Sequence, residues 1–130
     1  MKPRTNTPSA CPCGKGPYAS CCAPLHAGTP AASAEALMRS RYSAYALRLA
    51  DYVLASWHPS TRPAELDLSG DAAQWIGLQV LAAKTQGERA EVEFVARFRI
   101  GGRAQRMHEL SSFVLEDGRW FYVDGVMREK

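Results

Sequence analysis

The sequence predicts an α+β domain in which N-terminal helices pack on a curved four-stranded antiparallel meander. Two patterns indicate this class. Apolar residues recur at helical spacing between Ser33 and Trp57, and from Gly77 onward apolar and polar residues alternate as in half-buried strands. The chain has 130 residues, of which 46% are hydrophobic, and this is enough for one core. Helices first and a run of strands afterwards make an α+β domain.

The helical part is expected to contain two helices and one further turn. Ser33 can cap the first helix, because a serine side chain accepts hydrogen bonds from the free N–H groups of a first turn. A second short helix is expected at 52–57, capped by Asp51 and stopped before Pro59. Residues 71–76 are expected to add a helical turn. The first helix continues through its apolar positions Met38, Tyr42, Tyr45 and Leu49.

The four strands are expected at 77–84, 89–100, 103–116 and 119–126. Gly101-Gly102 and Asp117-Gly118 have the composition of two-residue hairpin turns, and Gln86-Gly87 is a weaker turn. A two-residue turn fixes the register of the strands that it joins, so opposed residues can be counted from it.

Four cysteines, Cys11, Cys13, Cys21 and Cys22, lie within twelve consecutive residues. Zn²⁺ takes four thiolate or imidazole ligands in a tetrahedron, and the glycines between the two pairs let the chain turn back. Disulfides are disfavoured, because adjacent cysteines form only a strained bridge and a reducing compartment opposes it. The sequence therefore predicts a small, closed zinc knuckle before the domain, with His26 as the alternative to Cys22.

At these residues a family resemblance appears. The pattern Cys-Pro-Cys-Gly…Tyr…Cys-Cys resembles the SEC-C motif, the zinc-binding tail of the SecA translocation ATPase, with one residue fewer between Cys13 and Cys21 than is common. The chain from Cys11 to Gly125 is also similar to the YchJ-like bacterial family. The segments that carry this second likeness are 37–45, 57–60 and 118–125.

The order of elements resembles the nuclear transport factor 2-like (NTF2-like) fold, a cystatin-like cone. We therefore expect a SEC-C-like knuckle with a short tail at 1–22, a linker rich in proline, glycine and alanine at 23–32, and an NTF2-like domain at 33–130. Since the patterned core residues all follow the linker, loss of the metal is expected to leave the domain folded.

One face of the expected sheet carries carboxylates among apolar side chains. Counting from the hairpin turns puts Phe94 opposite Glu109 and Ser111 opposite Asp124, and opposed residues share a face. Arg41 lies within the apolar arc of the first helix. Either Arg41 forms a buried ion pair with a carboxylate, or the carboxylates line a pocket and handle protons. The candidate pocket residues are Arg41, Glu109, Ser111, Asp124, Tyr122 and Trp120.

The opposite face carries charged residues, among them Arg97 directly opposite Arg106. We interpret this face as solvated, with a dimer contact or an acidic partner as the alternatives. His58 and His108 have no triad partners in the sequence and are expected to be structural.

Several functions remain open at this point. The formal charge of +3 is mild, and no apolar run is long enough for a membrane span, so a cytoplasmic location without membrane contact is expected. No nucleophile–base motif stands out, which leans against an enzyme. The favoured hypothesis is a zinc-stabilised macromolecule-binding module whose partner, by the SEC-C resemblance, is a protein; nucleic acid, the ribosome or a second copy of the chain are also open.

The alternative hypothesis is a small-molecule site in the cone. Glu109 and Asp124 would then serve binding alone or an isomerase- or dehydratase-type proton transfer. In a third interpretation the knuckle only fastens the N-terminus and recognises nothing.

Overall fold

We describe the fold from a computed structural model, which defines residues 10–70 and 73–128. Its sheet is an antiparallel meander with the strand order β1-β2-β3-β4, as the sequence predicts. The strands are β1 (Gln74–Gln86), β2 (Arg89–Ile100), β3 (Arg103–Glu116) and β4 (Arg119–Met127). The helical turn predicted at 71–76 is wrong for residues 74–76, which belong to β1; residues 71 and 72 lie outside the described residues.

The helical elements precede the sheet. They are a short 3-10 helix η1 (Tyr18–Ser20) and the α-helices α1 (Ala23–His26), α2 (Ala34–Leu47) and α3 (Ala50–Ala55). Ser33 caps α2 as predicted, because its Oγ accepts a hydrogen bond from the Ala36 N–H at 3.0 Å. Asp51 lies in the first turn of α3 rather than at its cap, which is Leu49. The segment predicted as a linker at 23–32 contains α1.

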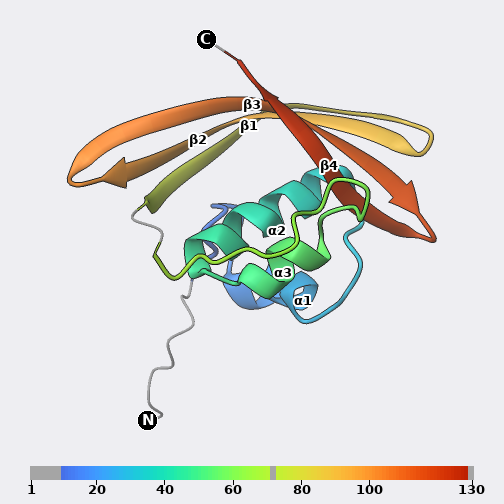
Figure 1. Cartoon of the computed structure of the whole chain (residues 1–130), viewed down its shortest axis with the longest axis horizontal. Helices are drawn as coiled ribbons and strands as arrows, with labels where there is room; N and C mark the ends of the chain where they lie inside the picture. Colours follow the sequence, from blue (N-terminus) through green and yellow to red (C-terminus); the bar gives the residue numbers. More distant parts are fainter. Residues whose placement is uncertain (1–9, 71–72, 129–130) are drawn as a thin grey trace.

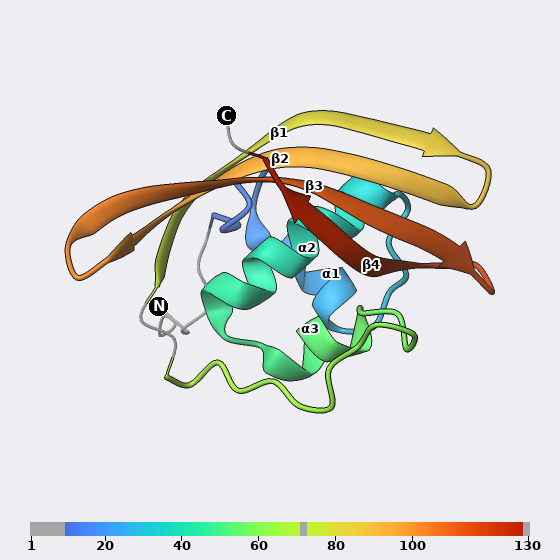
Figure 2. The same ribbon diagram turned by 45° about the horizontal axis from the view of Figure 1, so that its top comes forward.

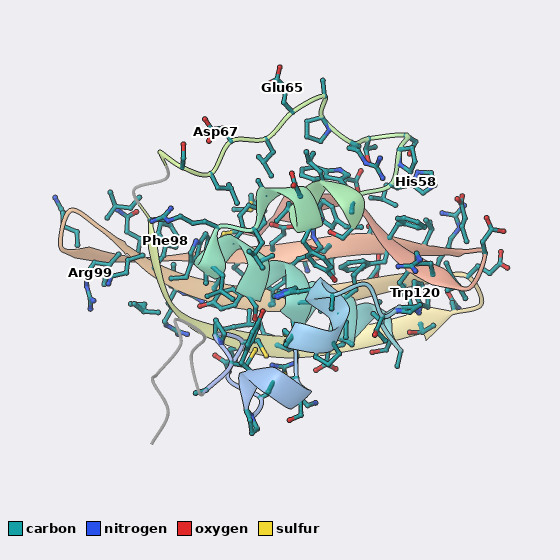
Figure 3. The ribbon with its side chains drawn as sticks, turned by 90° about the horizontal axis from the view of Figure 1, so that it is seen from below. His58, Glu65, Asp67, Phe98, Arg99 and Trp120 are labelled. Atoms are coloured by element: carbon teal, nitrogen blue, oxygen red, sulfur yellow. The ribbon has the colours of Figure 1, made fainter. Side chains whose placement is uncertain are left out.

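The molecule has two layers (Figures 1 and 2). The sheet curves over the helices, with α2 beneath it and α1 and α3 beyond α2. After α3, residues 56–70 run along the outside of the helical layer, where Glu65 and Asp67 point outward (Figure 3). The first of these residues pair with the free edge of β4: the Tyr122 N–H donates to the Ser56 carbonyl at 2.9 Å, and the His58 N–H donates to the Tyr122 carbonyl at 2.7 Å.

The main core lies between α2 and the inner face of the sheet, which is the face toward α2. The sheet covers one side of α2, and α3 and the segment 11–26 cover the other sides. This helix is therefore buried almost all round, and even its polar residues Ser40 and Ser43 are buried. The cysteines belong to the same core. Its buried members are Cys11, Cys13, Cys22, Ala34, Leu37, Met38, Tyr42, Ala90, Val92, Phe94, Ala96, Phe113 and Trp120.

The register of β2 and β3 is as counted from the sequence, with Phe94 opposite Glu109. Between β3 and β4 the register shifts by one residue: Phe113 faces Tyr122 as predicted, but Ser112 rather than Ser111 faces Asp124. A bulge therefore inserts one residue and turns the following side chains to the other face. The prediction that Asp124 lies on the inner face is wrong, because its side chain is exposed on the outer face.

Candidate metal centre and cavity

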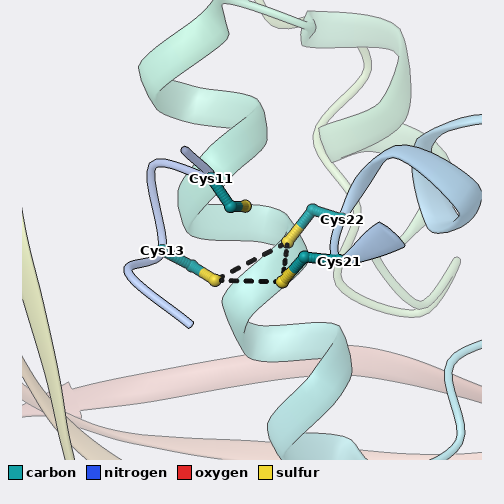
Figure 4. A group of neighbouring side chains, drawn as sticks. All are labelled: Cys11, Cys13, Cys21 and Cys22. Carbon is teal, nitrogen blue, oxygen red and sulfur yellow. Dashed lines mark hydrogen bonds between the residues drawn. The ribbon is translucent and has the colours of Figure 1, made fainter. Parts of the chain in front are cut away.

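The four cysteine sulfurs converge at one point beside α2 (Figure 4). All four Sγ atoms lie within 4.8 Å of one another. Cys13 Sγ is 3.5 Å from Cys21 Sγ and 3.9 Å from Cys22 Sγ, and the Cys21 and Cys22 sulfurs are 4.0 Å apart. None of the four cysteines forms a disulfide. The segment from Cys11 to Cys22 is called the cysteine knuckle below.

A tight loop brings the two cysteine pairs together. The Cys11 N–H donates to the Gly16 carbonyl at 2.8 Å, and the Gly14 N–H donates to the Cys11 carbonyl at 2.9 Å. Gly14 has φ +84°, a conformation that glycine adopts without strain. Cys22 then serves as the N-terminal cap residue of α1, which begins with Ala23-Pro24. Both pairs are thus positioned by local backbone structure.

The donor set fits a single metal ion. In a tetrahedron with metal–sulfur bonds of about 2.3 Å, the sulfurs are about 3.8 Å apart, close to the spacings of Cys13, Cys21 and Cys22. The thiols also share protons: a hydrogen bond from Cys22 lowers the pKa of Cys13 to about 4, and the same contact raises that of Cys22. Burial raises the pKa of Cys21 to about 11. A cation can take the place of these shared protons.

Side chains of α2 support the cysteine knuckle from behind. Ser43, fully buried, has its Oγ 3.3 Å from Cys11 Sγ and donates to Cys22 Sγ at 3.4 Å. Arg39 Nη1 donates to the Cys13 carbonyl at 3.3 Å. These contacts join the knuckle to the domain, and the sequence analysis did not find them. The only signal was the pair of small polar residues, Ser40 and Ser43, among the apolar positions of the helix.

His26 lies outside the sulfur cluster, although the sequence allowed it as the fourth ligand. Its Nε2 donates to the Ser40 carbonyl at 2.9 Å, and its Nδ1 accepts from the Tyr18 hydroxyl at 2.7 Å. The carbonyl can only accept, so it fixes the proton on Nε2. Burial lowers the pKa of His26. Both ring nitrogens are thus engaged, and His26 joins the knuckle to α2.

A cavity of about 280 Å³ lies between α2 and the inner face of the sheet. Its walls are mostly apolar and aromatic, and polar groups come from a few residues. It is lined by Met38, Arg41, Tyr42, Tyr45, Trp75, Phe94, Ala96, Met107, Glu109, Ser111, Phe113 and Tyr122. Four of the six predicted pocket residues therefore line one cavity.

Glu109 is the carboxylate of the cavity, and its side chain is half-buried. Its Oε2 accepts hydrogen bonds from Ser111 Oγ at 2.7 Å and from the Tyr122 hydroxyl at 3.4 Å. Burial, and secondly the Glu109 charge, raise the pKa of Tyr122, which stays protonated as a donor. The carboxylate lies against Gly125 of β4, where a Cβ atom would overlap Oε2.

Arg41 is buried but does not form the predicted ion pair. Its Nη1 donates to the Val53 carbonyl at 3.1 Å and to Ser56 Oγ at 2.7 Å. The guanidinium Cζ lies 4.1 Å from the ring centroid of Tyr122 and 5.0 Å from that of Trp57. Burial lowers the pKa of Arg41. Within the described ranges Arg41 has no carboxylate oxygen at 4.0 Å or less; oxygen acceptors and two aromatic faces hold it instead.

The other predicted site residues lie elsewhere. Trp120 is buried in the main core and does not line the cavity. The bulge puts Asp124 on the outer face, away from the cavity. Ser111, which was expected to lie opposite Asp124, donates a hydrogen bond to Glu109 instead. Sequence analysis also missed Gly125, whose missing side chain makes room for the Glu109 carboxylate.

The outer face of the sheet is polar where the sequence predicts it. Arg97 and Arg106 are directly opposed and exposed. His108 Nε2 lies 2.7 Å from Glu93 Oε2, and His58 Nε2 lies 2.9 Å from Glu116 Oε2. In the part of the chain that the structure covers, no helix is long and apolar enough to cross a membrane.

The fold and the two sites define a class of protein: a small α+β cone with an N-terminal cysteine cluster that could hold a metal ion. A family model described as the middle NTF2-like domain of YchJ matches residues 33–125. The chain therefore belongs to the YchJ family, as the sequence motifs indicated.

Relatives and solved structures agree with this assignment. The chain is 55% identical to a UPF0225 protein of Chromobacterium violaceum, covering 98% of this chain and 99% of the relative. A UPF0225 protein of Xanthomonas campestris is 57% identical, covering 95% and 98%. The solution structure of a SEC-C motif containing protein from Rhodopseudomonas palustris matches with a TM-score of 0.83 and 41% identity, over 92% of this chain and 99% of that one. A crystal structure of a SEC-C motif containing protein from Psychrobacter arcticus matches with a TM-score of 0.78 and 30% identity, over 95% and 85%.

Proposed function

We propose that this protein binds a small, largely apolar molecule in the cavity, while the cysteines hold a structural zinc ion that fixes the cysteine knuckle against α2. The observation that carries the proposal is the cavity of about 280 Å³, with aromatic walls and the polar groups of Arg41, Glu109 and Ser111. Ligand sites in proteins are mostly apolar concavities with a few convergent polar groups.

Zinc is the metal that the site favours, because a set of four thiolates selects soft or borderline ions and a tetrahedral arrangement suits Zn²⁺. When bound, the ion supplies a cross-link between the two cysteine pairs. Four sulfur ligands leave no position for substrate or water, so the role is structural. A cytoplasmic location fits, since the thiols must stay reduced. Elemental analysis of protein purified without added metal should find zinc near one equivalent per chain.

The test of ligand binding uses a variant that fills the cavity. Ala96 lines the cavity and is 1% exposed, whereas Ala82 is an exposed residue of β1. Ala96→Leu should abolish the chemical-shift changes that a collection of small aromatic compounds causes in the cavity side chains, and Ala82→Leu should leave them. If no compound gives saturable shifts in the wild-type protein, the proposal is wrong.

The same cavity supports proton transfer as a second candidate. The observation in its favour is a carboxylate, Glu109, held by two hydroxyl groups beside apolar walls. Such a carboxylate could remove a proton from a bound molecule. If it does, Glu109→Gln would retain ligand binding and lose hydrogen–deuterium exchange at the acidic position of that ligand.

A macromolecular partner also remains a proposal. It is supported by the likeness to SEC-C motif containing proteins and by the exposed Lys15, Ala19 and Ser20 of the cysteine knuckle. The exposed Arg97–Arg106 pair would suit nucleic acid, the ribosome or a second copy of the chain. Affinity purification with the wild-type protein, a Cys21→Ser, Cys22→Ser variant and an Arg97→Glu variant separates these surfaces. A partner that binds the cysteine knuckle should no longer be captured by the cysteine variant. A partner that binds the outer face of the sheet should no longer be captured by Arg97→Glu.

A further inference from the structure

The volume of the cavity limits the size of its ligand. The inference drawn below about this ligand rests on the proposed small-molecule function. A cavity of about 150 Å³ is enough for benzene. The cavity under the sheet is about 280 Å³, which allows one or two rings with a small substituent. Aromatic walls from three elements, namely Tyr42, Trp75 and Phe94, favour a flat body.

The polar groups of the cavity have spare hydrogen-bonding capacity. Among the described residues, Glu109 accepts hydrogen bonds through Oε2, and none reaches its Oε1. Arg41 likewise donates through Nη1, and its Nε and Nη2 atoms have no acceptor in the described chain. A carboxylate has room for further donors, and a guanidinium has five N–H groups. The cavity therefore offers one acceptor and a set of donors.

These two residues flank one side chain. The Arg41 guanidinium lies over the ring of Tyr122, and the hydroxyl of the same ring reaches Glu109. Their charges interact: the Glu109 charge opposes the lowering of the Arg41 pKa that burial causes. A ligand head group beside Tyr122 can therefore meet both residues.

The charge balance of the cavity decides between classes of ligand. Arg41 and Glu109 contribute one charge of each sign. A cationic ligand would add to the charge of Arg41, and an anionic ligand would add to that of Glu109, in surroundings that are mostly apolar. A neutral head group with one N–H donor and one carbonyl acceptor meets both residues without an uncompensated charge. We propose that the cavity binds a neutral, planar molecule with a carboxamide- or lactam-type edge, its N–H directed to Glu109 and its oxygen to Arg41.

Four probes that share a phenyl ring and differ in the head group test this proposal on the full-length, zinc-loaded protein. Benzamide carries the predicted edge, benzoate is an anion, benzylamine is a cation and toluene has no polar head. Titrations followed by NMR give a Kd for each. One satisfied hydrogen bond is worth about a factor of ten, so benzamide should bind at least about tenfold more tightly than each of the other three.

A pair of variants assigns the preference to the cavity carboxylate. Glu109→Gln removes the negative charge, so benzoate should overtake benzamide. The matched control is Glu93→Gln, on the outer face of the sheet beside His108, which should leave the order of the probes unchanged. Amide spectra of both variants establish that they are folded.

The outcomes separate this inference from the proposed function. Tighter binding of benzoate or benzylamine than of benzamide to the wild-type protein would overturn the ligand class and leave small-molecule binding standing. Equal binding of toluene and benzamide would overturn the polar edge. If none of the four probes gives a saturable shift up to its solubility limit, the inference fails together with the proposed function.

Discussion

The two sides of α2 hold polar clusters of opposite character. Ser43 faces the cysteine sulfurs and is 0% exposed, whereas Arg41, two residues earlier and therefore about 200° around the helix, lines the cavity. On the sulfur side the side chains satisfy one another: Ser43 bonds the cysteines, and His26 uses both ring nitrogens. On the cavity side, Arg41 and Glu109 line the cavity and keep hydrogen-bonding atoms that have no partner among the described residues.

This difference separates a structural site from a binding site. A closed cluster with all its ligands in place stabilises the fold and leaves nothing for a substrate. Polar groups that remain available in an apolar cavity are costly to the fold unless a ligand or water meets them. The comparison therefore predicts that loss of a cysteine appears mainly as lost stability, and loss of the Glu109 carboxylate mainly as lost binding.

The largest effect is expected from removal of the metal or of a ligand. Cys22 is 2% exposed and lies in the same core as Leu37 and Val92, so a Cys22→Ser variant should lose both the metal and core contacts. We expect a loss of roughly 3 kcal/mol or more in the free energy of unfolding. Urea unfolding followed by circular dichroism measures it.

The extent of unfolding tests the relation between the knuckle and the domain. The linker composition predicted that the domain stays folded when the metal is stripped. The shared core, with Cys11, Cys13 and Cys22 among its buried members, argues instead that chelation loosens α2 as well. Unchanged tryptophan fluorescence and unchanged amide signals of α2 after chelation would support the independent knuckle and contradict the packing argument.

The second largest effect is expected from Arg41→Ala. This change leaves Ser56 Oγ without its Arg41 donor, takes one of two donors from the Val53 carbonyl, which keeps the hydrogen bond from Ser56 Oγ, and removes the contact with Tyr122. We therefore expect a loss of about 2–3 kcal/mol. The matched control is Arg39→Ala on the same helix. Arg39 forms a partly exposed pair with Glu35 and donates one hydrogen bond to the Cys13 carbonyl, so its loss should cost only about 1 kcal/mol. Thermal unfolding measures both variants. Equal losses of stability in Arg41→Ala and Arg39→Ala would show that the buried contacts of Arg41 add nothing to the stability of the protein.

Most of the fold could be predicted because its signals are local. Gly101 and Gly102 have φ +57° and +81°, and Asp117 and Gly118 have φ +51° and +76°, as two-residue hairpin turns require. These turns fix the register of the residues next to them, so Glu109 and Ser111 could be placed on the inner face by counting. The cysteines were equally clear, because their spacing alone brings four sulfurs together.

The parts that could not be predicted depend on contacts between distant elements. Residues 120–123 read Trp-Phe-Tyr-Val, four apolar residues in a row. Such a run does not show which residues face inward, so the sequence gives no sign of the bulge that moves Asp124 to the outer face. The partners of Arg41 are a backbone carbonyl and a hydroxyl group at the end of α3. Neither is visible in a search for opposite charges, and this explains the mistaken ion pair.

The third prediction concerns the space that Gly125 leaves for the Glu109 carboxylate. Gly125→Ala would place a Cβ atom where Glu109 Oε2 lies, so the carboxylate must leave Ser111. We expect a loss of about 1–2 kcal/mol and weaker binding of benzamide. Gly77→Ala is the control, because a Cβ at this position of β1 meets nothing within 4 Å. Its stability should be unchanged or raised by up to about 1 kcal/mol. Wild-type benzamide affinity in Gly125→Ala would contradict the role of Glu109.

The smallest effect on stability is expected from Ser43→Ala, although this residue touches two cysteines. Ser43 Oγ lies 3.3 Å from Cys11 Sγ and 3.4 Å from Cys22 Sγ, but a hydroxyl has a single hydrogen and can donate to one thiolate at a time. The variant therefore loses one hydrogen bond, of about 1 kcal/mol, and gains about 0.4 kcal/mol from the better helix propensity of alanine. Zinc affinity should fall about tenfold, the low end for the loss of a group that supports metal ligands. Competition with a chromophoric chelator measures this, with Ser20→Ala on the exposed part of the cysteine knuckle as the control. A loss of stability above about 2 kcal/mol, with zinc affinity unchanged, would mean that Ser43 fills space against the sulfurs and does not support them as ligands.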